Sequence, residues 1–255
     1  MDKCALFALL LVLGAQAQPQ RAPKIINGHS ATHQPYNAFI MYLNAQNAGF
    51  FGGGSLISDR HVLTAAINIF GYQRWNVGLG SNIFTQLATI TSTQAIAHPN
   101  FNPTNRANDI GVIMLPSSVV FTTYVYPIRL PPLTYINQLP VENEEGTIVG
   151  FGFTSSSSTT RADYLMHSFQ RVVNHNRCLQ FFPVQSPYQF CAEDNIERSN
   201  VCNGDLGAGF VTIERGRPIL TGIASLVAQN CGAQNPTGYT RIAAYRQWIH
   251  QVAYI

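Results

Sequence analysis

The stretch Cys202-Asn203-Gly204-Asp205-Leu206-Gly207-Ala208-Gly209 decides how this sequence is interpreted. Its three glycines within six residues predict a backbone in conformations that a side chain would forbid, and the cysteine in front suggests a covalent staple. A loop of this kind presents backbone N–H groups, as an oxyanion hole does when it receives developing negative charge. The residue at the apex, Leu206, has no proton to give and no lone pair with which to attack. The loop is typical of a catalytic scaffold whose chemistry has been lost.

The composition indicates an exported all-β protein. The chain has 255 residues, and only 11% of them are charged. Glycine, proline, small polar and aromatic residues are frequent, which is typical of a secreted β protein rather than a helical or disordered one. The formal net charge of +3 is too small to indicate binding to nucleic acid or to a membrane surface, so we expect neither partner.

The first 24 residues predict export and processing. Residues 1–17 read as a signal peptide, with Lys3 at the start, an apolar run, and the small-x-small site Ala15-Gln16-Ala17. A buried N-terminal helix is the alternative. Residues 18–24 form a short polar segment that ends at Lys24, before two isoleucines and a glycine, which is the pattern of an exposed processing site.

The cysteines favour disulfides over a metal site. Cys4 lies in the predicted signal peptide, and four cysteines remain for an oxidising compartment, which allows three pairings. A zinc site would compete, but the sequence has no paired Cys-x-x-Cys spacing, and no His-Glu-x-x-His motif occurs. We therefore expect no metal and no cofactor. The four cysteines are Cys178, Cys191, Cys202 and Cys231.

Short apolar runs separated by turn residues predict a sandwich or barrels of antiparallel strands. One helix is expected at the C-terminus, where Ile242, Tyr245, Trp248, Ile249 and Val252 recur at steps of three and four residues. The expected strands are Ala38–Leu43, Gly54–Ile57, Val62–Ala66, Trp75–Leu79, Ile110–Leu115, Thr147–Phe153 and Leu220–Val227.

Several short motifs then occur in a fixed order along the chain. They are Ile25-Ile26-Asn27-Gly28, Gly52-Gly53-Gly54-Ser55-Leu56-Ile57, Val62-Leu63-Thr64-Ala65-Ala66, Asn108-Asp109-Ile110-Gly111-Val112, Pro127-Ile128-Arg129-Leu130-Pro131, Gly204-Asp205-x-Gly207 and Gly238-Tyr239-Thr240-Arg241. In this order they resemble the chymotrypsin/trypsin family of secreted serine proteases, over about residues 25–255. The arthropod digestive and collagenolytic branch looks most similar.

The resemblance implies a fold class. It is all-β, with two antiparallel six-stranded Greek-key β-barrels and a C-terminal α-helix. By the same resemblance, residues 25–255 form one protease-like domain. We expect the first barrel at about 25–130, the second at about 131–240 and the helix at about 241–253.

The resemblance also assigns the catalytic positions. The family uses a hydroxyl nucleophile, an imidazole and a carboxylate together. Here the imidazole position falls on Ile67, the carboxylate position on Asp109 and the nucleophile position on Leu206, while Gly204 and Leu206 supply the oxyanion-hole scaffold. Because neither Ile67 nor Leu206 can accept a proton or attack a carbonyl, we expect no functional catalytic residue.

Four positions map to the specificity pocket of that family: Asn200, Ser225, Val227 and Thr237. Asn200 falls at the base of the pocket, where an acid would select Lys or Arg, and it carries no charge. Val227 stands where the family usually has a glycine, so we expect a neutral and narrowed pocket.

Cleavage after Lys24 would create a new N-terminus at Ile25, and the family pairs that α-ammonium with an acid at the position of Asp205. We therefore expect a cleavage-triggered switch in which Lys24, Ile25 and Asp205 take part, as in a zymogen. The alternative is that Asp205 only accepts hydrogen bonds from nearby amides.

The resemblance further implies two disulfides and the loss of a third. The family's bridge near the imidazole position is absent at both ends, where Gly52 and Asn68 stand. The pairs implied are Cys178–Cys191 and Cys202–Cys231.

These inferences together predict a secreted, extracellular protease homologue that is monomeric and acts by binding. Its partner would be a protease, an inhibitor or another component of a protease cascade, with this chain as cofactor or inhibitor decoy. The alternative is an active secreted serine endopeptidase of the same family. A serine-directed organophosphate distinguishes the two, because it labels an enzyme at one site.

Overall fold

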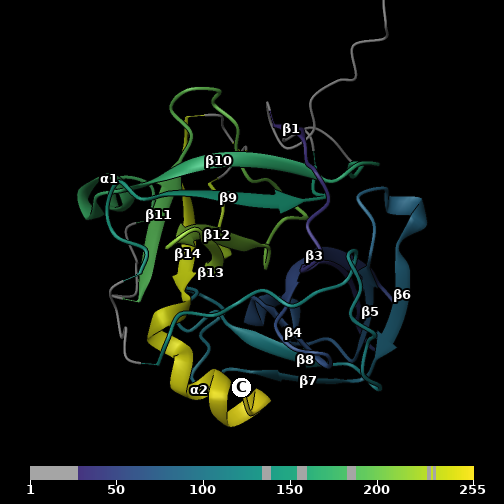
Figure 1. Cartoon of the computed structure of the whole chain (residues 1–255). Helices are drawn as coiled ribbons and strands as arrows, with labels where there is room; N and C mark the ends of the chain where they lie inside the picture. The colour runs from purple at the N-terminus through teal and green to yellow at the C-terminus, as the bar shows by residue number, and fades with distance from the viewer. Residues whose placement is uncertain (1–27, 134–138, 154–159, 183–187, 229–230, 232–233) are drawn as a thin grey trace, which may run out of the picture.

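The computed structural model describes residues 28–133, 139–153, 160–182, 188–228, 231 and 234–255. Within them the chain forms two sheets of antiparallel strands, one above the other in Figure 1, with a helix at the C-terminus. The all-β fold class expected from the sequence is confirmed. The predicted signal and activation segments, at 1–17 and 18–24, lie outside the described residues.

The first sheet is built from the N-terminal half of the chain. Its strands run in the order β6-β5-β2-β3-β4-β8-β7. The strand β2 is buried on both faces, with Ala38, Ile40 and Tyr42 in one core cluster and Phe39 in another, which suits its place inside the sheet. The strands are β2 (Asn37–Leu43), β3 (Gly49–Leu56), β4 (His61–Thr64), β5 (Arg74–Leu79), β6 (Ala88–Ser92), β7 (Gln94–Ala97) and β8 (Gly111–Met114).

The second sheet closes on itself. Six of its strands follow the order β10-β11-β14-β13-β12-β9, and β9 pairs with β10 to complete the ring. The remaining strand, β1, pairs with β10 through His29 and Ser30. The family resemblance places residues 25–130 in the first barrel, but β1, at His29 and Ser30, pairs with a strand of the second sheet. The strands are β1 (His29–Ser30), β9 (Glu145–Gly150), β10 (Met166–Val173), β11 (Gln189–Glu193), β12 (Gly209–Glu214), β13 (Arg217–Leu226) and β14 (Thr237–Arg241).

The C-terminal helix begins later than its apolar pattern predicts. Residues Ile242–Tyr245 form a 3-10 turn, and the α-helix α2 covers Arg246–Ala253. Ile242, Tyr245 and Ile249 are nevertheless buried in one core cluster, as their spacing predicts. The short helical elements before it are Ala66–Asn68, Phe84–Gln86 and α1 (His175–Leu179).

One core cluster joins the two sheets. It contains Phe39 and Leu63 from the first sheet together with Val149 and Leu220 from the second. Apolar burial of this kind holds the sheets in one arrangement, at roughly 25 cal/mol per Å² of apolar surface removed from water. The loop at Leu206 lies along this junction, since its backbone bonds to Gly53 of β3.

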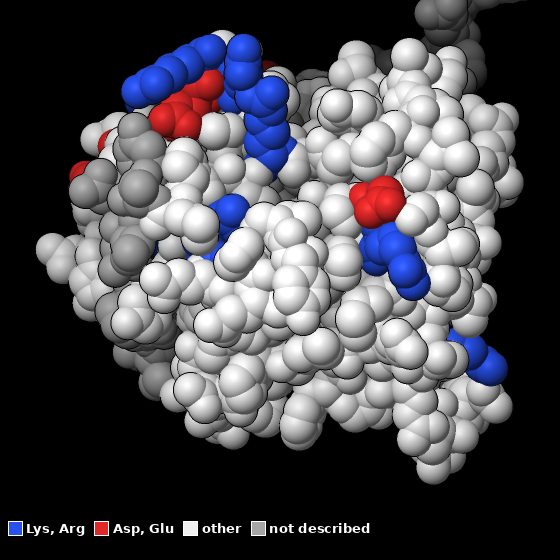
Figure 2. All heavy atoms as spheres, turned by 60° about the horizontal axis from the view of Figure 1, so that its bottom comes forward, with Lys and Arg blue, Asp and Glu red and all other residues white. Residues whose placement is uncertain are grey.

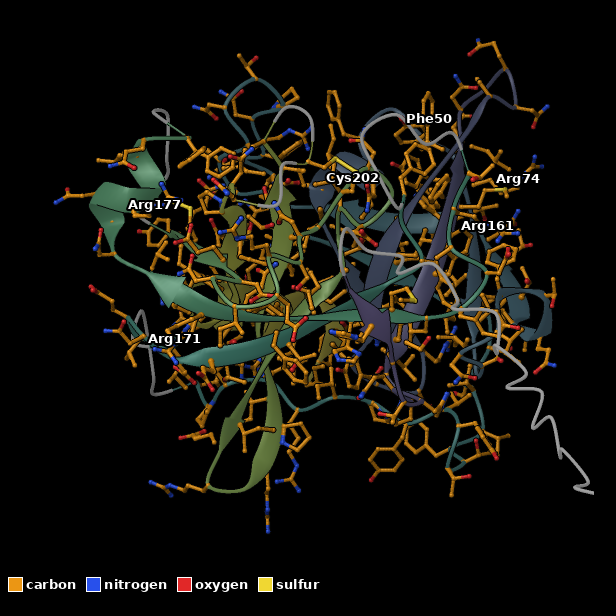
Figure 3. The ribbon with its side chains drawn as sticks, turned by 90° about the horizontal axis from the view of Figure 1, so that it is seen from above. Phe50, Arg74, Arg161, Arg171, Arg177 and Cys202 are labelled. Atoms are coloured by element: carbon orange, nitrogen blue, oxygen red, sulfur yellow. A yellow bond between two sulfur atoms is a disulfide. The ribbon has the colours of Figure 1, made fainter. Side chains whose placement is uncertain are left out.

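Both expected disulfides are confirmed. Cys178 of α1 pairs with Cys191 of β11, and Cys202 pairs with Cys231, with Cα atoms 5.5 and 5.1 Å apart. Figure 3 shows the second bridge beside Cys202. Both bridges lie in the part of the chain that builds the second sheet.

Charge is scarce on the first sheet and its connections. Figure 2 shows that the face carrying β7, β8 and α2 is mostly uncharged. Between residues 29 and 128 the charged side chains are Asp59, Arg60, Arg74, Arg106 and Asp109. Of these, Asp109 is fully buried.

Candidate functional site

The loop at Leu206 is held by its two left-handed glycines. Gly204 has φ +92° and Gly207 has φ +91°, a region that side chains disfavour. Backbone bonds tie the loop to itself, from Asp205 N to the Cys202 carbonyl at 3.1 Å and from Ala208 N to the Asp205 carbonyl at 3.0 Å. The sequence predicted this strained turn, and the structure has it.

The carbonyl of Leu206 faces the first sheet. It accepts one hydrogen bond from Gly53 N at 2.9 Å and another from Asn68 Nδ2 at 2.8 Å. The N–H groups of Gly204 and Leu206 donate to no acceptor within the described residues. These are the two groups that the sequence assigned to the oxyanion-hole scaffold.

Asp109 is fully buried and has three donors. Its Oδ1 accepts from Ile67 N at 2.9 Å, and its Oδ2 accepts from Ser225 Oγ at 2.6 Å and lies 3.5 Å from Arg106 Nη1. Burial raises the pKa of this carboxyl, and the bond from Ser225 and the Arg106 charge act against that rise. Ser225 itself is 1% exposed, so its hydroxyl serves the carboxylate rather than the cleft.

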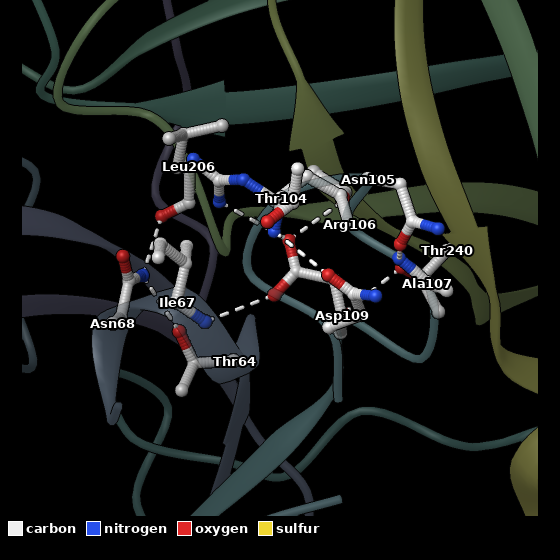
Figure 4. A network of polar contacts seen from close by, with 12 residues as sticks. Thr64, Ile67, Asn68, Thr104, Asn105, Arg106, Ala107, Asp109, Leu206 and Thr240 are labelled. Atoms are coloured by element: carbon white, nitrogen blue, oxygen red, sulfur yellow. Dashed lines mark hydrogen bonds and ion pairs between the residues drawn. The ribbon is translucent and has the colours of Figure 1, made fainter. Parts of the chain in front are cut away.

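The three residues assigned to the catalytic positions meet in one network, as Figure 4 shows. The backbone of Ile67 bonds to Asp109, and the next residue, Asn68, bonds to Leu206. The side chains of Ile67 and Leu206 are both half-buried hydrocarbon. The described contacts of Asp109 include a main-chain N–H, a hydroxyl and a guanidinium, and no imidazole.

Arg106 is the site residue that sequence reasoning missed. Its backbone is left-handed, with φ 58°, and its carbonyl accepts from Gln189 Nε2 of the second sheet at 3.1 Å. The side chain is 24% exposed and turns back to Asp109 three residues later. Within the part of the chain described, its guanidinium makes no other hydrogen bond. The sequence shows only an arginine three residues before Asp109, and nothing in it indicates that the arginine side chain points to that carboxylate.

The residues that the sequence assigns to the specificity pocket are bonded to one another. Asn200 Oδ1 accepts from Thr237 Oγ1 at 2.8 Å, and Asn200 Nδ2 donates to the Asn235 carbonyl at 2.8 Å. Asn200 is 2% exposed and Thr237 is fully buried, while Val227 packs on the core cluster of the second sheet. The polar groups at these positions are therefore uncharged, and the Thr237 hydroxyl is bonded to the Asn200 amide.

Asp205 is buried without a cation among the described residues. Its Oδ1 accepts from Gly152 N at 2.8 Å and its Oδ2 from Cys202 N at 3.2 Å. Burial raises the pKa of this carboxyl to about 7, and the two amide donors oppose the rise. Lys24 and Ile25, its expected partners in a cleavage switch, lie outside the described residues.

An asparagine takes the space of the absent third disulfide. Asn68 Nδ2 donates to Thr64 Oγ1 at 3.0 Å as well as to the Leu206 carbonyl. A Cβ on Gly52 would stand 2.6 Å from this Nδ2 and 2.6 Å from the Leu206 carbonyl oxygen. Where the family has a disulfide, this chain therefore has a hydrogen bond from Asn68 of the first half to the Leu206 carbonyl of the loop, and Gly52 leaves room for it.

This arrangement predicts that a disulfide can be restored. In the double variant Gly52→Cys/Asn68→Cys, the form with this bridge closed should be more stable by about 3 kcal/mol than the form in which these two thiols are free and both native disulfides stay intact, because the bridge closes a loop of about 15 residues. Urea unfolding of the two forms measures the difference. Gly52→Cys alone should lose stability, since its side chain meets Asn68 and the Leu206 carbonyl. Equal stability of the two forms of the double variant would contradict the expected proximity.

Comparisons with known proteins agree with this geometry. The family model described as Trypsin matches residues 25–249. The collagenase of Hypoderma lineatum is 32% identical over 91% of this chain and 88% of its own length. CLIP domain-containing serine protease B15 of Anopheles gambiae is 30% identical over 99% of this chain and 75% of its own length. A solved HL collagenase structure superposes with a TM-score of 0.81 at 30% identity, covering 91% of this chain and 99% of its own.

The described residues show no metal cluster and no membrane-spanning helix. They contain no cluster of three or more His, Cys, Asp or Glu side chains suited to a metal ion. None of their helices is both long enough and apolar enough to cross a bilayer.

Proposed function

Because the chain belongs to the trypsin family of serine proteases, we propose that it is a secreted protease homologue that binds another extracellular protein and does not cut peptide bonds. The observation that carries this proposal is the partner set of Asp109. That carboxylate contacts the Ile67 N–H, the Ser225 hydroxyl and the Arg106 guanidinium. None of these donors can act as the base that takes a proton from a nucleophile. The side chain of Leu206, at the nucleophile position, has no such proton to give.

The lack of a usable nucleophile supports a binding role. In proteases stripped of triad members, the oxyanion hole and substrate binding leave roughly 10³–10⁴-fold catalysis over water. Enzymes typically reach at least about 10⁶-fold, so the remainder is not useful proteolysis. Secretion is supported by the two disulfides, which persist in oxidising compartments.

Among the binding roles, a cofactor in a protease cascade is favoured over an inhibitor decoy. A decoy must accept the side chain that an inhibitor inserts into the specificity pocket. Here the Thr237 hydroxyl and the Asn200 amide bond to each other in that place. The similarity to CLIP domain-containing serine protease B15 of Anopheles gambiae supports a cascade setting.

An active endopeptidase is the alternative, and labelling separates the two. A fluorophosphonate probe should leave the native chain unlabelled before and after cleavage behind Lys24, while an active trypsin treated in parallel takes up one adduct. Intact-mass measurement reads the result. A single stoichiometric adduct on the folded chain, lost on prior denaturation, would overturn the binding-only function.

Affinity capture then identifies the partner. Immobilised cleaved and uncleaved chains should retain different sets of extracellular proteins if the expected switch operates, with a protease or cascade component enriched by one form. The same proteins recovered equally on both forms would argue against the switch, and no specific protein on either form would argue against a binding role.

A further inference from the structure

The loop at Leu206 carries two hydrogen-bond donors that no described residue accepts from. The N–H groups of Gly204 and Leu206 have no acceptor within the described residues, while the Leu206 carbonyl is fixed away by Gly53 and Asn68. The loop cannot easily turn these groups elsewhere, because Gly207 N also bonds to the Ala224 carbonyl at 2.8 Å. Fixed, unpaired N–H groups of this kind favour a ligand oxygen with negative charge.

A cation stands on the other side of the same network. Arg106 reaches Asp109 from the first sheet with one nitrogen at 3.5 Å, a long contact. The Asp109 oxygens already have shorter bonds from Ile67 N and Ser225 Oγ. The guanidinium therefore keeps donors for a ligand. In Figure 4 its side chain extends from Asp109 towards Leu206.

The charge balance selects a monoanion. Asp109 contributes negative charge next to Arg106, which opposes a dianion such as phosphate. A carboxylate has two oxygens, one for the amide pair and one for the guanidinium, in the geometry that arginine favours. Between Arg74 and Asp109 the sequence has one charged residue, Arg106, so this segment contributes one cation to the site.

The contact between Asn200 and Thr237 limits the group that bears the carboxylate. Asn200 and Thr237 bond to each other with almost no exposure, and Val227 packs against the core beside them. We expect a long side chain to meet this buried pair, whereas glycine or alanine does not reach it. The half-buried hydrocarbon of Ile67 and Leu206 offers apolar contact instead of a reactive group.

From these observations we infer that the cleft binds the C-terminal carboxylate of a peptide chain that ends in a small residue. The Gly204 and Leu206 N–H groups hold one carboxylate oxygen and Arg106 holds the other. The inference rests on the proposed function, because it requires a cleft without a nucleophile. Its ligand has the form of a protease product, so the site would sense chain ends that other proteases release.

Matched peptides test it on the full-length chain. Isothermal titration with N-acetylated tetrapeptides should show that a C-terminal Ala carboxylate binds at least about tenfold more tightly than the same peptide amide, the usual value of a charge-assisted hydrogen bond. A C-terminal Phe or Lys carboxylate should bind at least about tenfold more weakly than Ala. Equal binding of acid and amide overturns the inference, and so does acetate that binds as tightly as the peptide.

Two variants localise the effect. Arg106→Gln should remove most of the preference for acid over amide, whereas Arg74→Gln, an exposed arginine of β5 paired with Asn47, should leave it unchanged. A preference that survives Arg106→Gln in a folded protein would refute the role of the guanidinium. Fluorophosphonate labelling of the native chain would refute the proposed function, whereas an unlabelled chain with no carboxylate preference would refute this inference alone.

Discussion

A variant that carries Ile67→His, Leu206→Ser and Arg106→Ala should hydrolyse a small alanine ester at least about a hundredfold faster than the native chain. The first two changes return the proton acceptor and the nucleophile to the network around Asp109. The third removes the guanidinium that now lies 3.5 Å from the Asp109 oxygen an imidazole would use. The expected gain is well below the full effect of a triad, roughly 10⁶-fold, because the cleft around these positions is packed for the hydrocarbon of Ile67 and Leu206. Initial rates and acyl-enzyme bursts measure it.

The matched controls separate the contributions of the three groups. Leu206→Ser alone has a hydroxyl without a base, so its rate should stay within about tenfold of the native rate. The Ile67→His/Leu206→Ser pair that retains Arg106 should be slower than the triple variant, because the arginine competes for Asp109. Adding Asp109→Asn to the triple variant should remove most of the gain. A triple variant no faster than Leu206→Ser alone would mean that the three positions do not form a catalytic geometry.

Between pH 4 and pH 7 the uncleaved chain should lose roughly 3–4 kcal/mol of unfolding free energy through Asp205. Burial raises the pKa of this carboxyl from 3.8 to about 7 in the folded chain. The folded state therefore binds a proton that the unfolded state has released across this window. The stabilisation is complete below pH 4 and is lost as the pH rises through 7. Urea unfolding at several pH values measures the slope.

The variant Asp205→Asn isolates this contribution. Asparagine keeps an oxygen for the N–H of Gly152 but does not titrate, so the difference in slope between the two proteins belongs to Asp205. Other acids, including Asp109, whose pKa burial also raises, contribute equally to both proteins. Identical slopes in the two proteins would contradict a raised pKa at Asp205.

Cleavage after Lys24 should abolish this pH dependence between pH 4 and pH 7. A new α-ammonium at Ile25 that pairs with Asp205 lowers the pKa of the carboxyl, so stability no longer falls from pH 4 to 7. The experiment is clean because the only lysines are Lys3 and Lys24. After a lysine-specific cut at Lys24, the α-amine is the only primary amine left on the large fragment. It should react slowly with amine reagents in the native chain and faster in Asp205→Asn. Equal reactivity in both would refute the switch and leave Asp205 with amide partners alone.

The fold was accessible from the sequence because it depends on backbone requirements that few residues satisfy. The left-handed glycines at 204 and 207 and the two disulfides, whose pairing the family resemblance supplied, are cases of this kind. The helix boundary was less accessible, since the apolar spacing that begins at Ile242 is satisfied equally by the 3-10 turn found there.

The polar details of the site could not be predicted in the same way. They depend on side-chain directions that arise only when the two sheets meet. Arg106 turns towards Asp109 because its backbone is left-handed, and Thr237 reaches Asn200 from another strand. In the sequence, Asn68 indicated only that a disulfide of the family is absent. Its hydrogen bond to the Leu206 carbonyl could not be predicted, because it forms only where the loop packs against the first sheet.

The location of the two disulfides has a consequence for how the molecule comes apart. Both belong to the second sheet, and the first sheet contains no cysteine at any position from 28 to 133. A reductant therefore weakens one half directly and reaches the other only through the shared core and the Asn68 contact. Reduction and heating should start unfolding from different halves of the same molecule, so that its redox surroundings decide which half gives way first.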